Sequence, residues 1–134
     1  MLEVEQEAID YLNQALDRFD EALAIPLTNP LAIDGTIQRF EFSFELSWKA
    51  IKVIAFHFGV DQRSPRDAIK AAYGLGWIDD EAIWLEILKD RNLCSHTYKE
   101  DIANEVYRKL PAFASAMRLL AIALNTALKK SWIS

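Results

Sequence analysis

The segment from residue 32 to residue 59 constrains the fold most, because its sequence can be interpreted in two ways. Within it, "FEFSFELSW" alternates apolar and polar residues, which is typical of a half-buried strand. The flanking residues favour a helix, since apolar side chains recur at steps of three and four along the whole segment: Ile37, Phe40, Phe44, Trp48, Ile51 and Ala55. The segment also far exceeds the roughly 3–10 residues of an ordinary strand. We therefore predict one long helix.

Helical periodicity also covers residues 2–24, and the prolines of "IPLTNP" end that segment. A short helix is expected in "SPRDAIKAAYGLG", where Ser64 can cap the first turn, Pro65 suits the first helical position, and the glycines end the helix. "DDEAIWLEILKDRN" has helical spacing as well. Thr97 and Glu100 are spaced as in a capping box, which predicts that a last long helix begins near residue 98.

These segments together predict an all-α fold. We expect an up-and-down four-helix bundle with one additional short helix, formed by a single domain over residues 1–134. The second and last helices should be the longest, and five of their apolar side chains should lie in or near the core: Phe40, Phe44, Trp48, Ile51 and Phe113.

Composition narrows the classes of function. The net charge of −5 argues against a surface built for general nucleic-acid binding, although it permits a local site for one phosphate. Cys94 is the only cysteine, and His57 and His96 are the only histidines, so neither a disulfide nor a Cys/His zinc site is expected. We predict no metal site and no cofactor. The acidic N-terminus is unlike a signal peptide and the apolar runs are short, which indicates a cytoplasmic protein without membrane contact.

"DRNLCSHTYKED" is the most chemically varied stretch, and it lies at the junction between the last two long helices. It contains Arg91, Asn92, His96 and Tyr98. Such residues can simply cap helix ends. They can also act on a phosphodiester, because arginine binds phosphate oxygens and histidine exchanges protons near neutral pH. That scheme needs no metal. RNA cleavage requires a base and then an acid, and a symmetric dimer would supply two copies of the one histidine.

Glu41 and Glu45 lie one turn apart on the predicted second helix, flanked by aromatic residues. They are open to three interpretations: paired carboxylates for acid–base chemistry, a solvated strip, or supports for Arg91 or Arg39. We favour the supporting role, because a carboxylate on such a face requires a partner.

At this point the residues resemble a known family. "RNLCSHTY" fits the Arg-x4-His-x-Tyr motif of the HEPN superfamily. "IQRFEFSFELSWKAIK" and "SPRDAIKAAYGLGWIDDEAIWLEILKDRN" resemble its branch of nucleotidyltransferase substrate-binding proteins, and the likeness covers about positions 30–110. The resemblance implies a HEPN-like bundle that forms a homodimer or higher homo-oligomer. It also implies a minimal nucleotidyltransferase, encoded nearby, as partner. This chain lacks the Gly-Ser pair of that transferase's signature, so it is not the transferase itself.

The resemblance further implies residue roles. In related toxin–antitoxin pairs the HEPN chain cleaves RNA, which would make Arg91 and His96 the catalytic pair and Asn92 the residue that orients them. Tyr98 would be the site where the transferase adds adenylate. Two other interpretations stay open. One is a non-catalytic adaptor that presents a substrate to the transferase, and the other is an assembly protein whose polar junction only holds the bundle.

Overall fold

Helices account for the regular structure of the chain. The computed structural model describes residues 2–133, with side chains described for residues 3–131. A short 3₁₀ turn, η1, separates the last two of five α-helices: α1 (Leu2–Leu23), α2 (Ala32–His57), α3 (Pro65–Gly74), α4 (Glu81–Leu93), η1 (Cys94–His96) and α5 (Glu100–Ile133). No strand occurs within the described range. The predicted all-α fold is confirmed.

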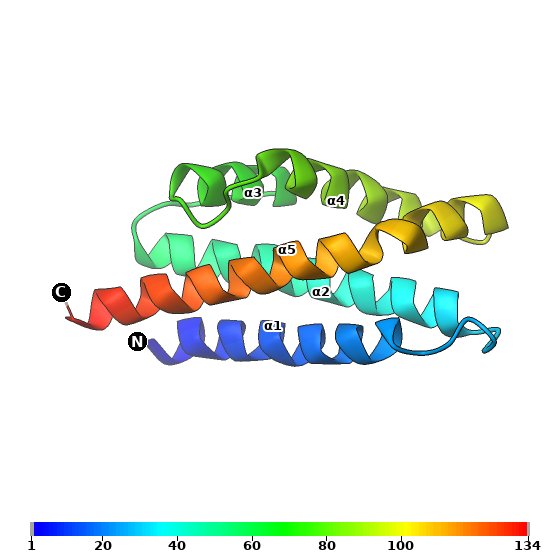
Figure 1. Cartoon of the computed structure of the whole chain (residues 1–134). Coiled ribbons are helices and arrows are strands. Elements are labelled where there is room, and N and C mark those ends of the chain that lie inside the picture. Colours follow the sequence, from blue (N-terminus) through cyan, green and yellow to red (C-terminus); the bar gives the residue numbers. More distant parts are fainter. Residues whose placement is uncertain (1, 134) are drawn as a thin grey trace.

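The four long helices run in alternating directions, and the short α3 precedes α4 (Figure 1). The α1–α2 and α4–α5 connections lie at one end of the bundle. Both ends of the described chain and the α2–α3 connection lie at the other (Figure 1). The polar stretch at residues 90–101 is therefore close to the α1–α2 end and far from the termini.

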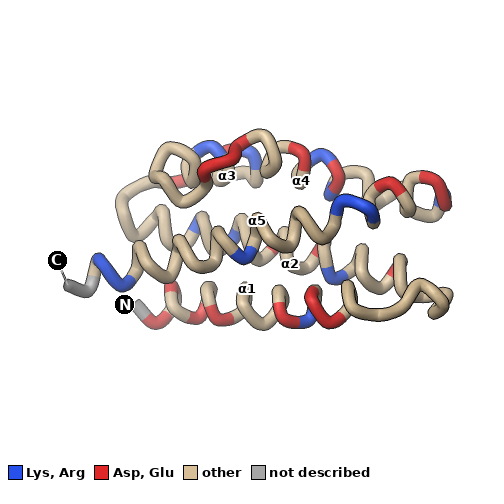
Figure 2. Tube along the Cα trace, viewed as in Figure 1, with Lys and Arg blue, Asp and Glu red and all other residues tan. Residues whose placement is uncertain are grey.

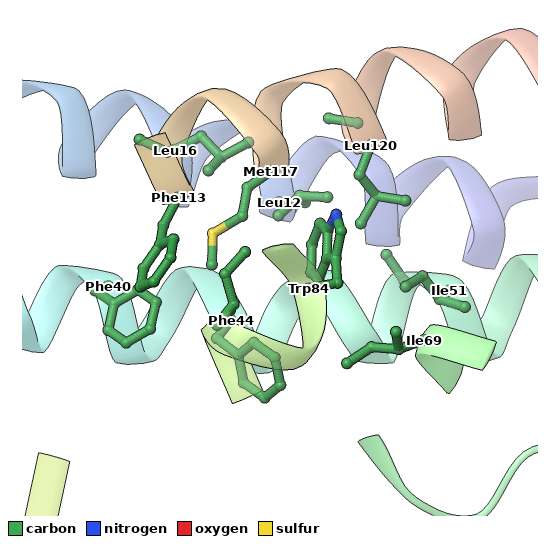
Figure 3. Packing of buried hydrophobic residues seen from close by; sticks show 14 of the residues in the cluster. Leu12, Leu16, Phe40, Phe44, Ile51, Ile69, Trp84, Phe113, Met117 and Leu120 are labelled. Carbon is green, nitrogen blue, oxygen red and sulfur yellow. The ribbon is translucent and has the colours of Figure 1, made fainter. Parts of the chain in front are cut away.

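The alternating segment "FEFSFELSW" lies inside α2, so the predicted helix is confirmed and the strand interpretation is excluded. Phe40 and Phe44 are fully buried, whereas 53% of Phe42 is exposed. Figure 3 shows Phe40 facing Phe113 of α5, with 5.6 Å between the ring centroids. Ile51 and Phe113 are also buried, and Trp48 packs partly buried against the core, as the sequence predicts.

Small hydroxyl side chains allow α1 and α2 to approach closely. Thr36, Ser43 and Ser47 are buried, and each donates to the carbonyl four residues earlier at 2.6–2.8 Å. Thr36 and Ser43 also lie 3.2 and 3.4 Å from carbonyls of α1. These contacts satisfy the buried hydroxyls and fix the register of α1 against α2, the helix that carries Phe44 and Glu45.

The helix boundaries follow local chemistry at three predicted positions. Ser64 Oγ accepts a hydrogen bond from the Asp67 amide at 3.1 Å and caps α3, as predicted. Gly59 and Gly76 have φ values of +85° and +81°, which only glycine adopts without strain, and they follow the ends of α2 and α3.

The capping box predicted at Thr97 and Glu100 is wrong. Thr97 has helical backbone angles, and its hydroxyl donates to the Cys94 carbonyl at 2.9 Å instead of accepting from an α5 amide. The η1 turn extends the chain beyond α4 by one tight turn, and α5 begins at Glu100, within two residues of the predicted start.

The stretch Glu100–Ser131 of α5 is long and apolar enough, by length and composition alone, to cross a membrane. Seven of its large apolar side chains are buried against the other helices: Val106, Leu110, Phe113, Met117, Leu120, Leu124 and Leu128. Leu119 and Ile122 are 68% and 57% exposed, so packing in the bundle accounts for only part of the apolar character of α5.

Candidate functional site

Arg91 lies in the last turn of α4, and its guanidinium is held against α2. Arg91 Nη2 donates to Glu45 Oε1 in an ion pair. The guanidinium carbon lies 5.8 Å from the centroid of the Phe44 ring, a cation–π distance. Arg91 Nη1 makes a longer hydrogen bond of 3.5 Å to Asn92 Oδ1. About a third of the Arg91 side chain stays exposed, so its remaining N–H groups can reach a ligand.

Glu45 is itself fixed on its other side. Its Oε2 accepts a hydrogen bond of 3.2 Å from Trp48 Nε1, one turn further along α2. The contact predicted between Arg91 and one of the two carboxylates is therefore present, and it is made by Glu45. Trp48 was predicted only as a core residue. Trp48 follows Glu45 by three residues, a spacing that places the two side chains on one face of a helix, and this is the sequence signal for their hydrogen bond.

Glu41 makes no hydrogen bond or ion pair among the described side chains, yet it belongs to the same electrostatic group. Partial burial raises the pKa of Glu41, the positive charge of Arg91 opposes that shift, and the carboxylate of Glu45 adds to it. A carboxyl group that takes up a proton more readily than usual, beside a held arginine, is typical of functional sites.

His96 and Tyr98 lie just beyond Arg91 and are exposed to solvent. Their ring centroids are 6.4 Å apart. Tyr98 is 78% exposed, and Lys99 Nζ lies 5.9 Å from the centre of its ring. No hydrogen bond or ion pair joins His96 to Arg91 in the part of the chain that the structure describes. Within one chain, the motif therefore brings Arg91 together with Asn92 and Glu45, but does not tie it to His96.

A buried ion pair anchors the end of α4 to α5, and sequence analysis missed it. The Asp90 side chain is fully buried, and Lys109 Nζ lies 3.2 Å from Oδ1 and 3.0 Å from Oδ2. Lys109 also lies 3.6 Å from the more exposed Glu86. Burial raises the pKa of Asp90, and Lys109 only partly offsets that shift. An acidic residue beside Arg91 at a helix end is ordinarily solvated, so nothing in the sequence distinguished it.

Cys94 is unsuited to act as a nucleophile. Its thiol is half-buried and donates to the Asp90 carbonyl at 3.4 Å. Burial raises the pKa of this thiol to about 12, with the Glu41 and Asp90 carboxylates contributing and Arg91 opposing. The reactive thiolate is thus scarce at neutral pH. Among the described residues, no group of three or more His, Cys, Asp and Glu side chains is arranged to hold a metal ion.

Comparison with known proteins gives a family match over most of the chain. A family model described as "Nucleotidyltransferase substrate binding protein like" matches residues 3–126. The probable ribonuclease HepT of Haemophilus influenzae is 32% identical in an alignment of 93 residues, and the match covers 60% of this chain. The match spans 59% of that relative's length.

Two solved structures share the fold. A crystal structure of a Thermus thermophilus protein is 31% identical, with a TM-score of 0.80 over 84% of this chain and 98% of that one. A Haemophilus influenzae structure is 28% identical, with a TM-score of 0.68 over 93% of this chain and 99% of that one. The latter is described as revealing the fold of a substrate binding domain of a nucleotidyltransferase.

Proposed function

Because this chain belongs to the nucleotidyltransferase substrate-binding protein family and is related to a probable ribonuclease, we propose that it is the HEPN-type partner of a separately encoded minimal nucleotidyltransferase. We propose further that it acts in the cytoplasm as a toxin-like, metal-independent endoribonuclease. Arg91 and His96 are its catalytic residues, and Asn92, Glu41 and Glu45 are positioning residues.

The observation that carries this proposal is the orientation of Arg91. Glu45 and the Phe44 ring hold its guanidinium at the end of α4, a few residues before the exposed imidazole of His96. Holding the cation in advance lowers the cost of ordering it when charge develops on a phosphate. A histidine that is open to solvent can exchange protons with a substrate.

The chemistry follows from these two side chains. His96 removes the proton from a ribose 2′-hydroxyl, and O2′ attacks the adjacent phosphorus. Arg91 stabilises the charge that develops on the non-bridging oxygens. The bond from phosphorus to O5′ then breaks, O5′ takes a proton from a second histidine, and the products carry a 2′,3′-cyclic phosphate and a 5′-hydroxyl. The second histidine is the His96 of another copy in a homodimer. His57 of the same chain is too far away, because it is the last residue of α2, at the end of the bundle opposite the α4–α5 connection (Figure 1).

The proposed partner acts at Tyr98. The phenol oxygen attacks the α-phosphorus of ATP, its proton passes to the transferase, pyrophosphate leaves, and adenylate becomes bound to Tyr98. The exposure of 78% supports this role, because the ring needs no unfolding to reach another active site. Adenylate beside His96 would add negative charge and block approach of RNA.

One observation favours a second function, that of a non-catalytic adaptor presenting a substrate to the transferase. The Glu45 carboxylate already neutralises Arg91, and the chain has a net charge of −5, so a phosphate must compete with acidic groups. In that case the same residues form a docking surface for the transferase.

Three variants test the proposal. His96→Ala and Arg91→Ala should each slow cleavage of RNA by roughly a hundredfold to ten-thousandfold and relieve any growth arrest caused by expression. Lys99→Ala, an exposed neighbour outside the proposed pair, is the matched control and should retain activity. If the wild type leaves RNA intact while the first two variants weaken binding to the transferase, the adaptor function replaces the nuclease.

A further inference from the structure

A second surface feature adjoins the Arg91 site. A groove of about 490 Å³ runs between α1 and α2, which lie side by side in Figure 1. The α1–α2 groove is defined here by six of its lining residues: Tyr11, Arg18, Arg39, Phe42, Glu45 and Leu46. Neither the predicted motif nor the proposed chemistry uses its aromatic and basic side chains.

Two aromatic rings in the groove are open to solvent. Phe42 is 53% exposed and Tyr11 is 50% exposed. Phe40 and Phe44, the neighbouring phenylalanines of α2, are fully buried. This helix therefore packs against a hydrophobic core, and Phe42 lies outside that core. Exposed rings that gather in one concave surface with a polar rim are typical of a binding surface, whereas single exposed apolar residues are common on any protein.

Two arginines at the same groove lack acidic partners. Within the described residues, neither Arg18 nor Arg39 has a carboxylate at ion-pair distance. Arg39 Nη1 donates to the Arg18 carbonyl at 3.5 Å, so its guanidinium reaches across to α1 beside Arg18. This is notable because α1 is rich in acidic positions (Figure 2). The nearest of these along α1, Asp17 and Asp20, lie 3.1 and 2.9 Å from a different cation, Arg118 of α5.

The groove is continuous with the Arg91 site through one side chain. Glu45 lines the groove and also holds Arg91. The register of α1 against α2 places the basic and the apolar side chains at different ends of the groove. Arg18 lies beside Arg39, and Ala15, one turn earlier in α1, lies beside Ser43, one turn later in α2. The basic end is therefore at Arg18 and Arg39, and the apolar end at Tyr11 and Leu46.

From this arrangement we propose that the α1–α2 groove binds one nucleotide of a single-stranded RNA whose neighbouring phosphate lies at Arg91. A base stacks on Phe42 and Tyr11, and a phosphate is bound by Arg18 and Arg39. Aromatic platforms beside basic side chains are the usual means of binding single strands without reading sequence. The groove is open along the surface, so a strand can enter and leave it, whereas a free mononucleotide is better held in an enclosed pocket. The choice of RNA rests on the proposed ribonuclease function.

The test measures affinity for a short, labelled 2′-O-methyl RNA, which cannot be cleaved, by fluorescence anisotropy in the His96→Ala background. Phe42→Ala should weaken binding by roughly 5- to 100-fold. Arg18→Gln and Arg39→Gln should each lower the dependence of log affinity on log salt by about 0.7. The matched controls are Phe56→Ala, another exposed phenylalanine of α2 but outside the groove, and Arg66→Gln, an exposed arginine of α3. Both should bind like the parent.

Three outcomes would overturn the proposal. The first is equal affinity in groove and control variants. The second is AMP binding as tightly as the RNA and displacing it, which would assign the groove to a free nucleotide. The third is a loss of dimer in sedimentation of Phe42→Ala with unchanged RNA affinity, which would assign it to a second copy of the chain. The RNA in this assay cannot be cleaved, so the assay measures binding alone. A wild type without nuclease activity would refute the proposed ribonuclease function, and the binding measurement would still decide whether the groove binds RNA.

Discussion

The buried pair between Asp90 and Lys109 gives a prediction about the scaffold of the site. Lys109→Met should destabilise the fold by about 3–5 kcal/mol at neutral pH, because it leaves a fully buried carboxylate without its cation. Methionine preserves most of the apolar stem of lysine, so the loss should come from the charge rather than from packing.

The magnitude depends on burial. The Asp90 side chain is 0% exposed and that of Lys109 is 22% exposed, so water cannot replace the lost cation. The additional contact from Lys109 to Glu86 involves a carboxylate that is 48% exposed, and contributes at most about 1 kcal/mol. A loss of about 3–5 kcal/mol is a large share of a typical stability of roughly 5–15 kcal/mol. It should lower the melting temperature by roughly 10–20 °C.

Urea unfolding followed by circular dichroism measures this effect, with Glu86→Gln as the matched control that should lose less than about 1 kcal/mol. Burial raises the pKa of Asp90, so the folded chain binds this proton more readily than the unfolded chain. The defect in Lys109→Met should therefore shrink as the pH falls towards the ordinary aspartate value of 3.8. A Lys109→Met variant no less stable than Glu86→Gln at neutral pH would refute the reasoning.

Three further predictions concern α2 and the thiol. Glu41→Gln should be more stable than wild type at neutral pH, because the raised pKa of Glu41 means that folding disfavours its charged form. This advantage should shrink as the pH falls towards 4.5 and Glu41 of the wild type takes up a proton. Urea midpoints measured against pH test this prediction. Cys94 should react with a thiol reagent more slowly than a free cysteine at neutral pH, and at the ordinary rate in denaturant, since its pKa is raised to about 12. Phe44→Ala should cost about 3–5 kcal/mol in chemical unfolding and Phe42→Ala less than about 0.5 kcal/mol, a contrast that a strand register would not give.

The fold could be predicted because most local signals agree with one another. In α2 the apolar stripe through Phe40, Phe44 and Ile51 extends over about five turns, whereas the misleading alternation covers only nine residues. Burial over a long helix outweighs the strand propensity of its aromatic residues. Ser64 caps α3 because its backbone is extended, with φ −146° and ψ 159°, as an N-cap residue requires. Thr97 instead has helical backbone angles at the end of the η1 turn, and its hydroxyl donates to the Cys94 carbonyl.

For the candidate site, the sequence indicates which residues to consider but not most of the contacts that they make. The spacing from Arg91 to Tyr98 identifies the motif, and the position of Glu45 on α2 indicates a carboxylate that needs a partner. The sequence does not show that Phe44 lies beneath Arg91, because that contact depends on how α4 crosses α2. Asp90 escaped prediction for the same reason, since its burial depends on Lys109 reaching it from α5. Contacts between distant helices are set by packing, which periodicity does not encode.

The proposed ribonuclease function is tested most directly by the chemistry of the RNA ends. Purified wild-type protein, without any partner and in the presence of a chelator, should cut single-stranded RNA to products with 2′,3′-cyclic phosphate and 5′-hydroxyl ends, detected by mass spectrometry. The His96→Ala variant should give none of these products above background. RNA left intact by the wild type at stoichiometric protein, or cut equally by His96→Ala, would contradict the assignment of Arg91 and His96 as a catalytic pair.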